Sequence, residues 1–498
     1  MKSEGKAIDR VSRKRRAGLL LHPTSFPGEA DHGDIGHQAY RFIEFLNTNG
    51  FKVWQMLPLG PTHDDKSPYQ CLSSHAGNPL LISLDWLVDR AWLDKSKINI
   101  IEDDKNYRLA CLQQAAHYFH EKNDSAWKEK INKFTNDNAY WLDDFVLFMA
   151  LKSRYMNQPW YEWPEALRHR EKNALAEARE ELEAIIKQNV FEQFVFFTQW
   201  QEIREYARRY NVEMFGDVPI FVAKDSADVW AKRENFLMDK DGCMDVVAGV
   251  PPDAFSETGQ RWGNPLFDWE YMQASGFAWW KERFKTQLSL FDMVRLDHFR
   301  GLEACWQIPE KEETAKNGKW VEVPGREMLR ELFATIEHLP LVAEDLGVIT
   351  DPVIKLKNDF NLPGMKVLQF AFDGNNANPH LPHCHEPGDV VYTGTHDNDT
   401  SLGWYRDDSN YNSRYFEDYT GQKYSTDKKA VLELIRLAFS SVSYLSIIPM
   451  QDILMLDSSA RMNMPGTVGD NWKWRFKWNQ LRQEIIDEVL YFMKLYQR

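Results

Sequence analysis

The stretch MVRLDHFR, residues 293–300, decides the fold of this chain, because a short apolar run ends abruptly there in charged residues. Seven further runs have the same form and are separated by stretches with helical character: GLLLHPTS from Gly18, VWQMLPLG from Val53, VEMFGDVPIF from Val212, LVAEDLG from Leu341, MKVLQFAF from Met365, VVYTGTHD from Val390 and LSIIPMQDIL from Leu445. Strands that alternate with helices form parallel sheets, and eight of them suit a closed (β/α)8 barrel better than an open sheet. The sequence therefore predicts an α/β protein with a (β/α)8 TIM barrel.

Two connections are too long for ordinary loops between a strand and a helix. Residues 61–211 predict a mostly helical inserted subdomain, in which the charge-dense segment 165–188 has the character of one solvated amphipathic helix. Residues 223–292 predict a second insertion that carries a rim loop at 249–264. We expect residues 1–498 to form one catalytic barrel with both insertions on its catalytic rim. Little besides a terminal helix follows the eighth strand, so no separate C-terminal β-domain is expected.

The composition limits the classes of binding partner and the cellular compartment that we expect for this protein. The 60 basic and 74 acidic residues give a net charge of -14, which argues against nucleic acid and favours a neutral substrate. No apolar run approaches the roughly 20 residues of a membrane helix, and the run at 17–21 is too short for a signal peptide. The five cysteines include no CxxC pair, as a reducing compartment allows. We expect a cytoplasmic protein without disulfides.

Three acidic residues stand at the ends of predicted strands, where a barrel of this kind carries its chemistry. Asp297 ends the fourth strand, Glu344 the fifth and Asp397 the seventh. Any one of them alone could equally be a helix cap or half of an ion pair. Three together, each beside a polar or cationic neighbour, favour a catalytic site.

The neighbours of these acids suggest separate roles. Arg295 and Asp297 are two residues apart on a strand and project to the same face, so the guanidinium should keep Asp297 ionised as a nucleophile. Glu344 follows an apolar run, where desolvation and nearby negative charge should raise its pKa and leave it a general acid. His298, His396 and Asp397 would supply hydrogen bonds to sugar hydroxyls as an oxocarbenium-like centre develops.

At these residues the sequence resembles the amylomaltases, also called 4-α-glucanotransferases or disproportionating enzymes, glycoside hydrolase family 77 of the α-amylase superfamily. The resemblance covers nearly the whole chain. It is most specific in RLDHFRG (295–301), AEDLGVIT (343–350), PGMKVLQFAF (363–372), YTGTHDNDT (392–400), GDVPIFVAKDSADVW (216–230), ARMNMPGT (460–467) and NWKWR (471–475).

The resemblance implies that Asp297 is the nucleophile, Glu344 the general acid/base and Asp397 the carboxylate that stabilises the transition state. It implies a substrate-binding set of Arg295, His298, His396, Asp217, Tyr69, Trp262, Asp253, Phe255 and Asn398. For Tyr69 and Trp262, ordinary loop packing is the alternative. The implied activity transfers a segment of a 1,4-α-D-glucan donor to the 4-hydroxyl of glucose or another 1,4-α-glucan, through a covalent glycosyl-enzyme with retention.

The same residues are compatible with two other functions. An α-amylase-like hydrolase would use the same three carboxylates, and a silent glucan-binding protein would not need all three. His380, His383, Cys384 and His385 crowd one loop, yet no second ligand cluster follows at a zinc-site spacing, which favours loop packing over a metal. No GxGxxG or Walker-type loop is present, and no cofactor is expected.

Overall fold

The computed structural model describes residues 14–28, 33–97, 105–252, 256–407, 411–467 and 469–498. Its main sheet has eight parallel strands in the order β10-β11-β12-β1-β2-β3-β6-β9. Their bounds are β1 Arg16–Leu20, β2 Val53–Gln55, β3 Glu213–Val218, β6 Met293–Leu296, β9 Leu341–Ala343, β10 Met365–Val367, β11 Val390–Tyr392 and β12 Leu445–Pro449. Seven strands lie within a predicted run, and β1 begins two residues before the run that starts at Gly18.

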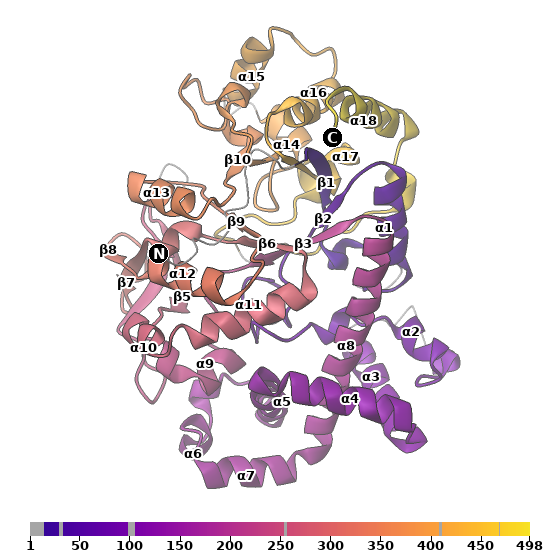
Figure 1. Cartoon of the computed structure of the whole chain (residues 1–498), viewed down its shortest axis with the longest axis vertical. Helices are drawn as coiled ribbons and strands as arrows, with labels where there is room; N and C mark the ends of the chain where they lie inside the picture. Colours follow the sequence, from indigo (N-terminus) through magenta and orange to yellow (C-terminus); the bar gives the residue numbers. More distant parts are fainter. Residues whose placement is uncertain (1–13, 29–32, 98–104, 253–255, 408–410, 468) are drawn as a thin grey trace.

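The sheet closes on itself almost completely (Figure 1). The two strands at the ends of the order, β9 and β10, follow one another in the sequence, and the backbone N–H of Ala343 donates to the carbonyl of Pro363 across the seam at 2.8 Å. Closure removes the unpaired edges that an open sheet exposes. The predicted barrel is confirmed.

Side chains alternate between two cores because successive residues of a strand point to opposite faces. One set packs together inside the barrel and draws on all eight strands; it includes Leu20, Val53, Phe215, Met293, Val342, Met365, Val390, Tyr392 and Ile447. The residues between them, such as Leu19, Trp54 and Val294, join the larger core between strands and helices. This period of two is why short apolar runs suffice to build the barrel.

Helices fill the long connection between β2 and β3 and form the lower part of the molecule in Figure 1. They are α2 Leu84–Asp89, α3 Lys105–Lys122, α4 Ser125–Asp137, α5 Ala139–Arg154, α6 Glu165–Arg168, α7 Lys172–Glu181 and α8 Glu183–Arg209. The prediction of one helix over 165–188 is wrong. Arg170 has a φ of 57°, a left-handed conformation that ends α6, and the segment continues as α7 and the first turns of α8.

A four-stranded antiparallel sheet, which the sequence did not predict, stands beside the barrel in the order β5-β4-β7-β8. Its strands are β4 Val246–Val250, β5 Gln260–Pro265, β7 Ala304–Pro309 and β8 Lys319–Glu322. Two of them precede β6 and two follow it, so the sheet joins two connections of the barrel. The hairpin β4–β5 includes the predicted rim loop, whose residues 253–255 lie outside the described part.

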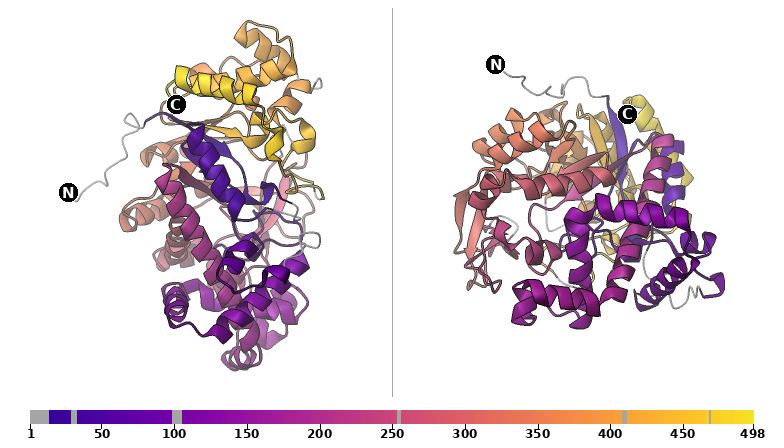
Figure 2. Two further views of the ribbon diagram at one scale, coloured as in Figure 1. Left: turned by 90° about the vertical axis from the view of Figure 1, so that its right-hand side faces the viewer. Right: turned by 60° about the horizontal axis from the view of Figure 1, so that its bottom comes forward.

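The remaining helices flank the barrel. They are α1 His37–Thr48, α9 Ala227–Ala231, α10 Trp269–Ala274, α11 Ala278–Leu290, α12 Gly325–Thr335, α13 Asp351–Asp359, α14 Ser401–Arg406, α15 Asn412–Thr420, α16 Asp427–Ser440, α17 Met450–Ile453 and α18 Gln483–Leu495. Figure 2 shows that the helices following β11 and those of the long insertion lie at opposite ends of the molecule.

Two arginines from distant parts of the chain meet at the carboxyl end of α16. Arg15 Nη2 donates to the carbonyl of Phe439 at 2.7 Å, and Arg498 Nε donates to the same carbonyl at 2.9 Å. The last carbonyls of a helix lack partners within the helix and carry partial negative charge, which cations offset. The beginning and end of the described chain are therefore fixed to one helix terminus.

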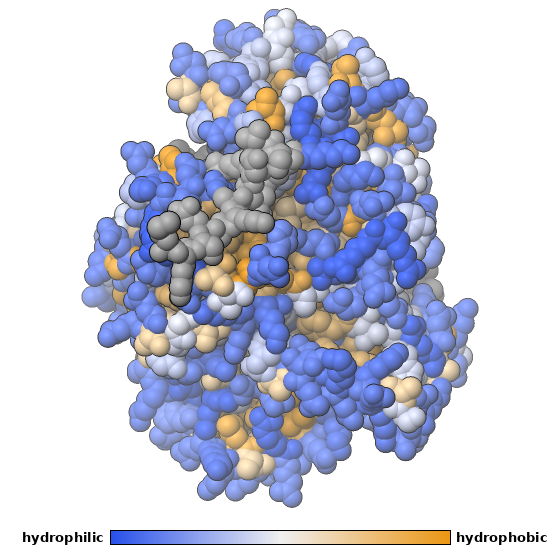
Figure 3. Space-filling model, viewed as in Figure 1, coloured by the Kyte–Doolittle hydropathy of each residue, from blue (hydrophilic) through white to orange (hydrophobic). Residues whose placement is uncertain are grey.

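In the described part of the chain, no helix combines the length and the apolar character needed to cross a membrane. The face shown in Figure 3 is mainly hydrophilic, with small separate apolar patches.

A substitution at Gly216 of β3 tests the packing that positions the site. A Cβ atom added there would lie 2.2 Å from Cδ2 of Phe291, in a strand that cannot move without disturbing the barrel. We expect Gly216→Ala to lower the free energy of unfolding by about 1–3 kcal/mol through overpacking, measured by urea denaturation. In a Phe291→Leu background the cost of Gly216→Ala should shrink; an equal cost in both backgrounds would contradict this contact as its cause.

Candidate active site

Two of the three predicted carboxylates stand at the ends of neighbouring strands. In the register between β6 and β9, Leu296 pairs with Ala343, so Asp297 and Glu344 each follow one member of that pair. The Glu344 carboxyl group is fixed by backbone donors on both oxygens. Oε2 accepts from the N–H of His298 at 2.7 Å, and Oε1 accepts from the N–H of Leu346 at 3.0 Å. The register thus brings the two carboxyl groups together at one end of the barrel.

Arg295 joins two carboxylates inside the barrel. Its Nη1 atom donates to Oδ2 of Asp217, and its Nη2 atom donates to Oδ1 of Asp297 at 2.5 Å. Asp217 pairs with Arg295 in the register between β3 and β6, and the side chains of both are 5% exposed or less. The Tyr69 hydroxyl donates to the same Asp217 oxygen at 2.6 Å. The rigid fork of the guanidinium fixes one oxygen of Asp297 and leaves the other without an ion-pair partner among the described residues.

Burial separates the pKa values of Asp297 and Glu344. Burial raises the pKa of Asp297 to about 6, while Arg295 acts in the opposite direction and Asp217 adds to the rise. Burial and the nearby Asp297 raise the pKa of Glu344 to about 8. At neutral pH, Asp297 is therefore mainly ionised and Glu344 mainly protonated, as the sequence predicted for this pair.

Asp397 has a different environment, in the loop after β11. Its Oδ2 atom lies 3.3 Å from Nε2 of His396, and its Oδ1 atom accepts from Nδ2 of Asn463 at 2.6 Å. Burial would raise the pKa of Asp397, but His396 and the hydrogen bond from Asn463 outweigh burial and lower it below the usual range. Arg461 donates to the backbone carbonyl of Asp397 at 2.6 Å and fixes the loop. Asp397 is thus an anion at neutral pH.

Aromatic rings border these carboxylates. The rings of Tyr69 and His396 are stacked, with centroids 5.1 Å apart and planes 13° apart, and Trp472 lies 5.9 Å from Tyr69. Trp262 meets His298 edge to face at 4.8 Å. His298 itself has a φ of 54°, a left-handed conformation that turns the chain immediately after Asp297. Flat rings beside hydrogen-bonding groups suit the apolar faces of sugar rings.

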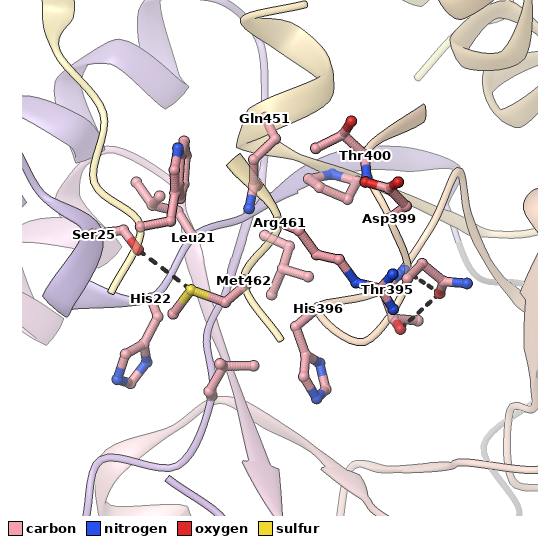
Figure 4. A pocket seen from close by; sticks show the side chains of 15 residues that line it. Leu21, His22, Ser25, Thr395, His396, Asp399, Thr400, Gln451, Arg461 and Met462 are labelled. Carbon is pink, nitrogen blue, oxygen red and sulfur yellow. Dashed lines mark hydrogen bonds between the residues drawn. The ribbon is translucent and has the colours of Figure 1, made fainter. Parts of the chain in front are cut away.

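A pocket lies beneath the loop of Asp397, and Figure 4 shows His22 and His396 on its lining. His22 Nδ1 is buried and has no hydrogen-bond partner among the described residues. Burial, with a smaller contribution from His396, lowers the pKa of His22 to about 3, so the ring is neutral at physiological pH. The pocket places an uncharged ring near the loop that carries Asp397.

Three further predicted residues complete the account of the site, and Asn398 follows Asp397 and lines the same pocket as His396. Asn398 uses its Oδ1 atom to close a turn, accepting from the N–H and the hydroxyl of Thr395 at 2.8 and 2.9 Å. Asp253 and Phe255 lie outside the described residues. Asn463, Arg461 and Trp472 were not among the residues predicted for the site. They lie in two motifs that carried the family resemblance, ARMNMPGT and NWKWR, and that signal could have identified them.

The histidine-rich loop uses its ring nitrogens in packing. His385 Nδ1 lies 2.7 Å from the Ser441 hydroxyl, and His380 Nδ1 accepts from the N–H of Val367 at 3.2 Å. His383 Nδ1 lies 3.1 Å from the Tyr419 hydroxyl. Within the described ranges, no group of three or more His, Cys, Asp or Glu side chains is arranged to hold a metal ion.

Comparisons with known proteins show which family this chain resembles along its length. A family model described as 4-alpha-glucanotransferase matches residues 21–481. The 4-alpha-glucanotransferase of Synechocystis sp. is 45% identical over 97% of this chain and 98% of its own length, and that of Thermus thermophilus is 45% identical over 94% and 96%. The solved amylomaltase of Streptococcus agalactiae in complex with acarbose is 34% identical, with a TM-score of 0.93 over 97% of this chain and all of that one.

The protonation state of Glu344 can be measured directly. We expect infrared spectra at pH 7 to show a protonated carboxyl band that Glu344→Gln removes. Asp297→Asn should weaken the band, because loss of the neighbouring negative charge lowers the pKa of Glu344 below about 8. Asp389→Asn, which alters a buried carboxyl that is not among the groups acting on Glu344, serves as a control. A Glu344 band that is unchanged in Asp297→Asn would contradict the coupling.

Proposed function

This chain belongs to the 4-alpha-glucanotransferase family, whose members act on 1,4-alpha-glucans, and we propose that it works by a retaining double displacement at Asp297 and Glu344. The observation that carries the proposal is the pair itself: Asp297 is held by Arg295 at the strand end next to that of Glu344, and the pKa of Glu344 is raised above that of Asp297. Neighbouring strands lie about 4.8 Å apart, and retention needs the two carboxyl groups about 5 to 5.5 Å apart. Residues at neighbouring strand ends suit that separation.

In the first step, the carboxylate of Asp297 forms a bond to the anomeric carbon of the donor as the bond from that carbon to the leaving oxygen breaks. Glu344 gives its proton to this 4-oxygen, so the leaving sugar departs as a neutral alcohol. Arg295 holds the other oxygen of Asp297 and keeps the nucleophile in one orientation. The product of this step is a covalent glycosyl-enzyme.

In the second step, Glu344 acts as a base. It takes the proton of an incoming 4-hydroxyl, which attacks the anomeric carbon and releases Asp297. The acceptor is glucose or another 1,4-α-glucan, in the place that water takes in a hydrolase. The two inversions together preserve the configuration of the donor.

The charges around the site support the oxocarbenium-like transition state. Asp397 remains an anion, and with His396 it offers hydrogen bonds to sugar hydroxyls that strengthen as positive charge develops. Burial, followed by the charge of Asp217, raises the pKa of Tyr69 well above its usual value, so its hydroxyl stays protonated. We assign Tyr69 and Trp262 to the walls that orient the sugar rings.

An α-amylase-like hydrolase is the second candidate, because it would use the same carboxylates with water as the acceptor. Incubation with pure maltotriose separates the two. We expect glucose and longer maltooligosaccharides to appear by chromatography while the total of reducing ends stays constant. Asp297→Asn should abolish turnover but leave glucan binding measurable. A rising total would establish hydrolysis, and no change in any product would favour a silent glucan-binding protein.

The pH dependence follows from the two pKa values. As the pH falls through about 6, Asp297 gains a proton and loses its nucleophilicity, so kcat/KM should decline. As the pH rises through about 8, Glu344 loses the proton that it must donate, so kcat/KM should decline again. The maltooligosaccharide substrate does not titrate in this range. We expect a bell-shaped profile from initial rates; a profile that is flat between pH 5 and 9 would contradict the assignment.

A further inference from the structure

Trp320 on β8 is an exposed indole whose position is fixed on one side. It keeps 37% of its surface exposed, and the guanidinium carbon of Arg300 lies 3.6 Å from the centre of its ring. Arg300 is only 7% exposed, so the ring covers a buried cation. A ring held by such a contact loses little conformational freedom when a ligand stacks on it.

Arg300 connects the Trp320 ring to the strand ends that carry Asp297 and Glu344. It follows Asp297 by three residues, and its Nη1 atom donates to the carbonyl of Val348 at 2.5 Å, in the loop after Glu344. The side chain of Val348 is 60% exposed. One buried guanidinium therefore sets Trp320 and Val348 as two exposed apolar groups beside the loop of the general acid.

The antiparallel sheet fixes the Trp320 ring from its other side, and we call this ring together with Val348 the platform. Trp306 of β7 pairs with Trp320, and their rings meet edge to face at 5.2 Å. The Trp306 indole N–H donates to the carbonyl of Ala315 at 2.9 Å, and the N–H of Ala315 donates to the carbonyl of Thr258 at 3.0 Å. Thr258 belongs to the rim loop between β4 and β5. The platform is thus built into the rim and is not a loose surface side chain.

The proposed mechanism indicates which part of a glucan chain would contact this platform. Glu344 protonates the leaving oxygen and later deprotonates the acceptor, so it lies on the side of the site that holds the leaving or incoming sugar. Arg300 joins Trp320 to the loop after Glu344, because it contacts both the Trp320 ring and the carbonyl of Val348. Under the proposed function, a chain that extends from the reacting 4-hydroxyl toward its reducing end runs toward this loop. The neutral C–H faces of pyranose rings stack on indole rings.

We propose that Trp320, with Val348 beside it, binds the reducing-end part of long α-1,4-glucan acceptors and leaving groups, several sugars from the reacting centre. The inference rests on the proposed function, because the direction of the chain follows from the role of Glu344. It makes Trp320 a residue that sets the preference for acceptor length. Trp320 takes no part in bond formation.

The test measures acceptor preference with maltotriosyl fluoride as the donor, because its fluoride leaving group occupies no sugar site beyond Glu344. We expect Trp320→Ala to raise the KM for maltohexaose as acceptor by about five- to tenfold, through loss of one stacking contact. The KM for glucose should stay unchanged. Trp320→Phe keeps an aromatic face and should retain most of the preference for the long acceptor. Tyr491→Ala, which removes an exposed aromatic of α18, is the matched control and should change neither KM.

The outcomes distinguish a failure of the proposed function from a failure of the binding role of Trp320. If wild-type protein transfers the maltotriosyl group to no acceptor, the proposed function fails. If wild-type protein transfers it normally and Trp320→Ala leaves the ratio of the two KM values unchanged, the platform is wrong while the function stands. A loss of kcat that is equal for glucose and maltohexaose would show that Trp320 only supports Arg300, and it too would overturn the platform.

Discussion

The chain of charges from the buried Asp217 and Arg295 to the half-buried Asp297 is the constraint on which the site depends. Removing such ions from water costs several kcal/mol each, and only close geometry with further hydrogen bonds offsets that cost. The barrel provides the geometry, because the register between β3 and β6 sets Asp217 opposite Arg295. A slip of β6 by one residue would turn the side chains of Arg295 and Asp297 to the other face of the sheet and separate Arg295 from Asp217.

The same chain of charges decides which carboxyl group holds the proton. Burial raises the pKa of both Asp297 and Glu344, and Arg295 opposes the rise in both, but of the two it forms its ion pair with Asp297. The two groups are close enough for their titrations to belong to the pair, and the first proton goes to Glu344. One cation placed on one side of a carboxylate pair thus produces a nucleophile and a general acid from similar side chains.

The rest of the site comes from connections that the barrel closes around this pair. Tyr69 follows β2 and stacks on His396 after β11, while Asn463 follows β12 and bonds to Asp397. The antiparallel sheet fixes the rim on the side of Glu344, through the contact of Trp320 with Arg300. Strands supply the ionic centre, and long connections supply the walls, because only loops can reach over the end of a barrel.

The sequence by itself determined what repeats locally: eight apolar runs, acids at the strand ends, and the spacing that puts Arg295 and Asp297 on one face. These features depend on residues within a few positions of one another. Only the tertiary structure decided the partners of Asp397 and the sheet that joins β4 and β5 to β7 and β8. It also decided the burial that separates the pKa values of Asp297 and Glu344. Contacts and desolvation of this kind arise between distant segments, and they exist only once the barrel has closed.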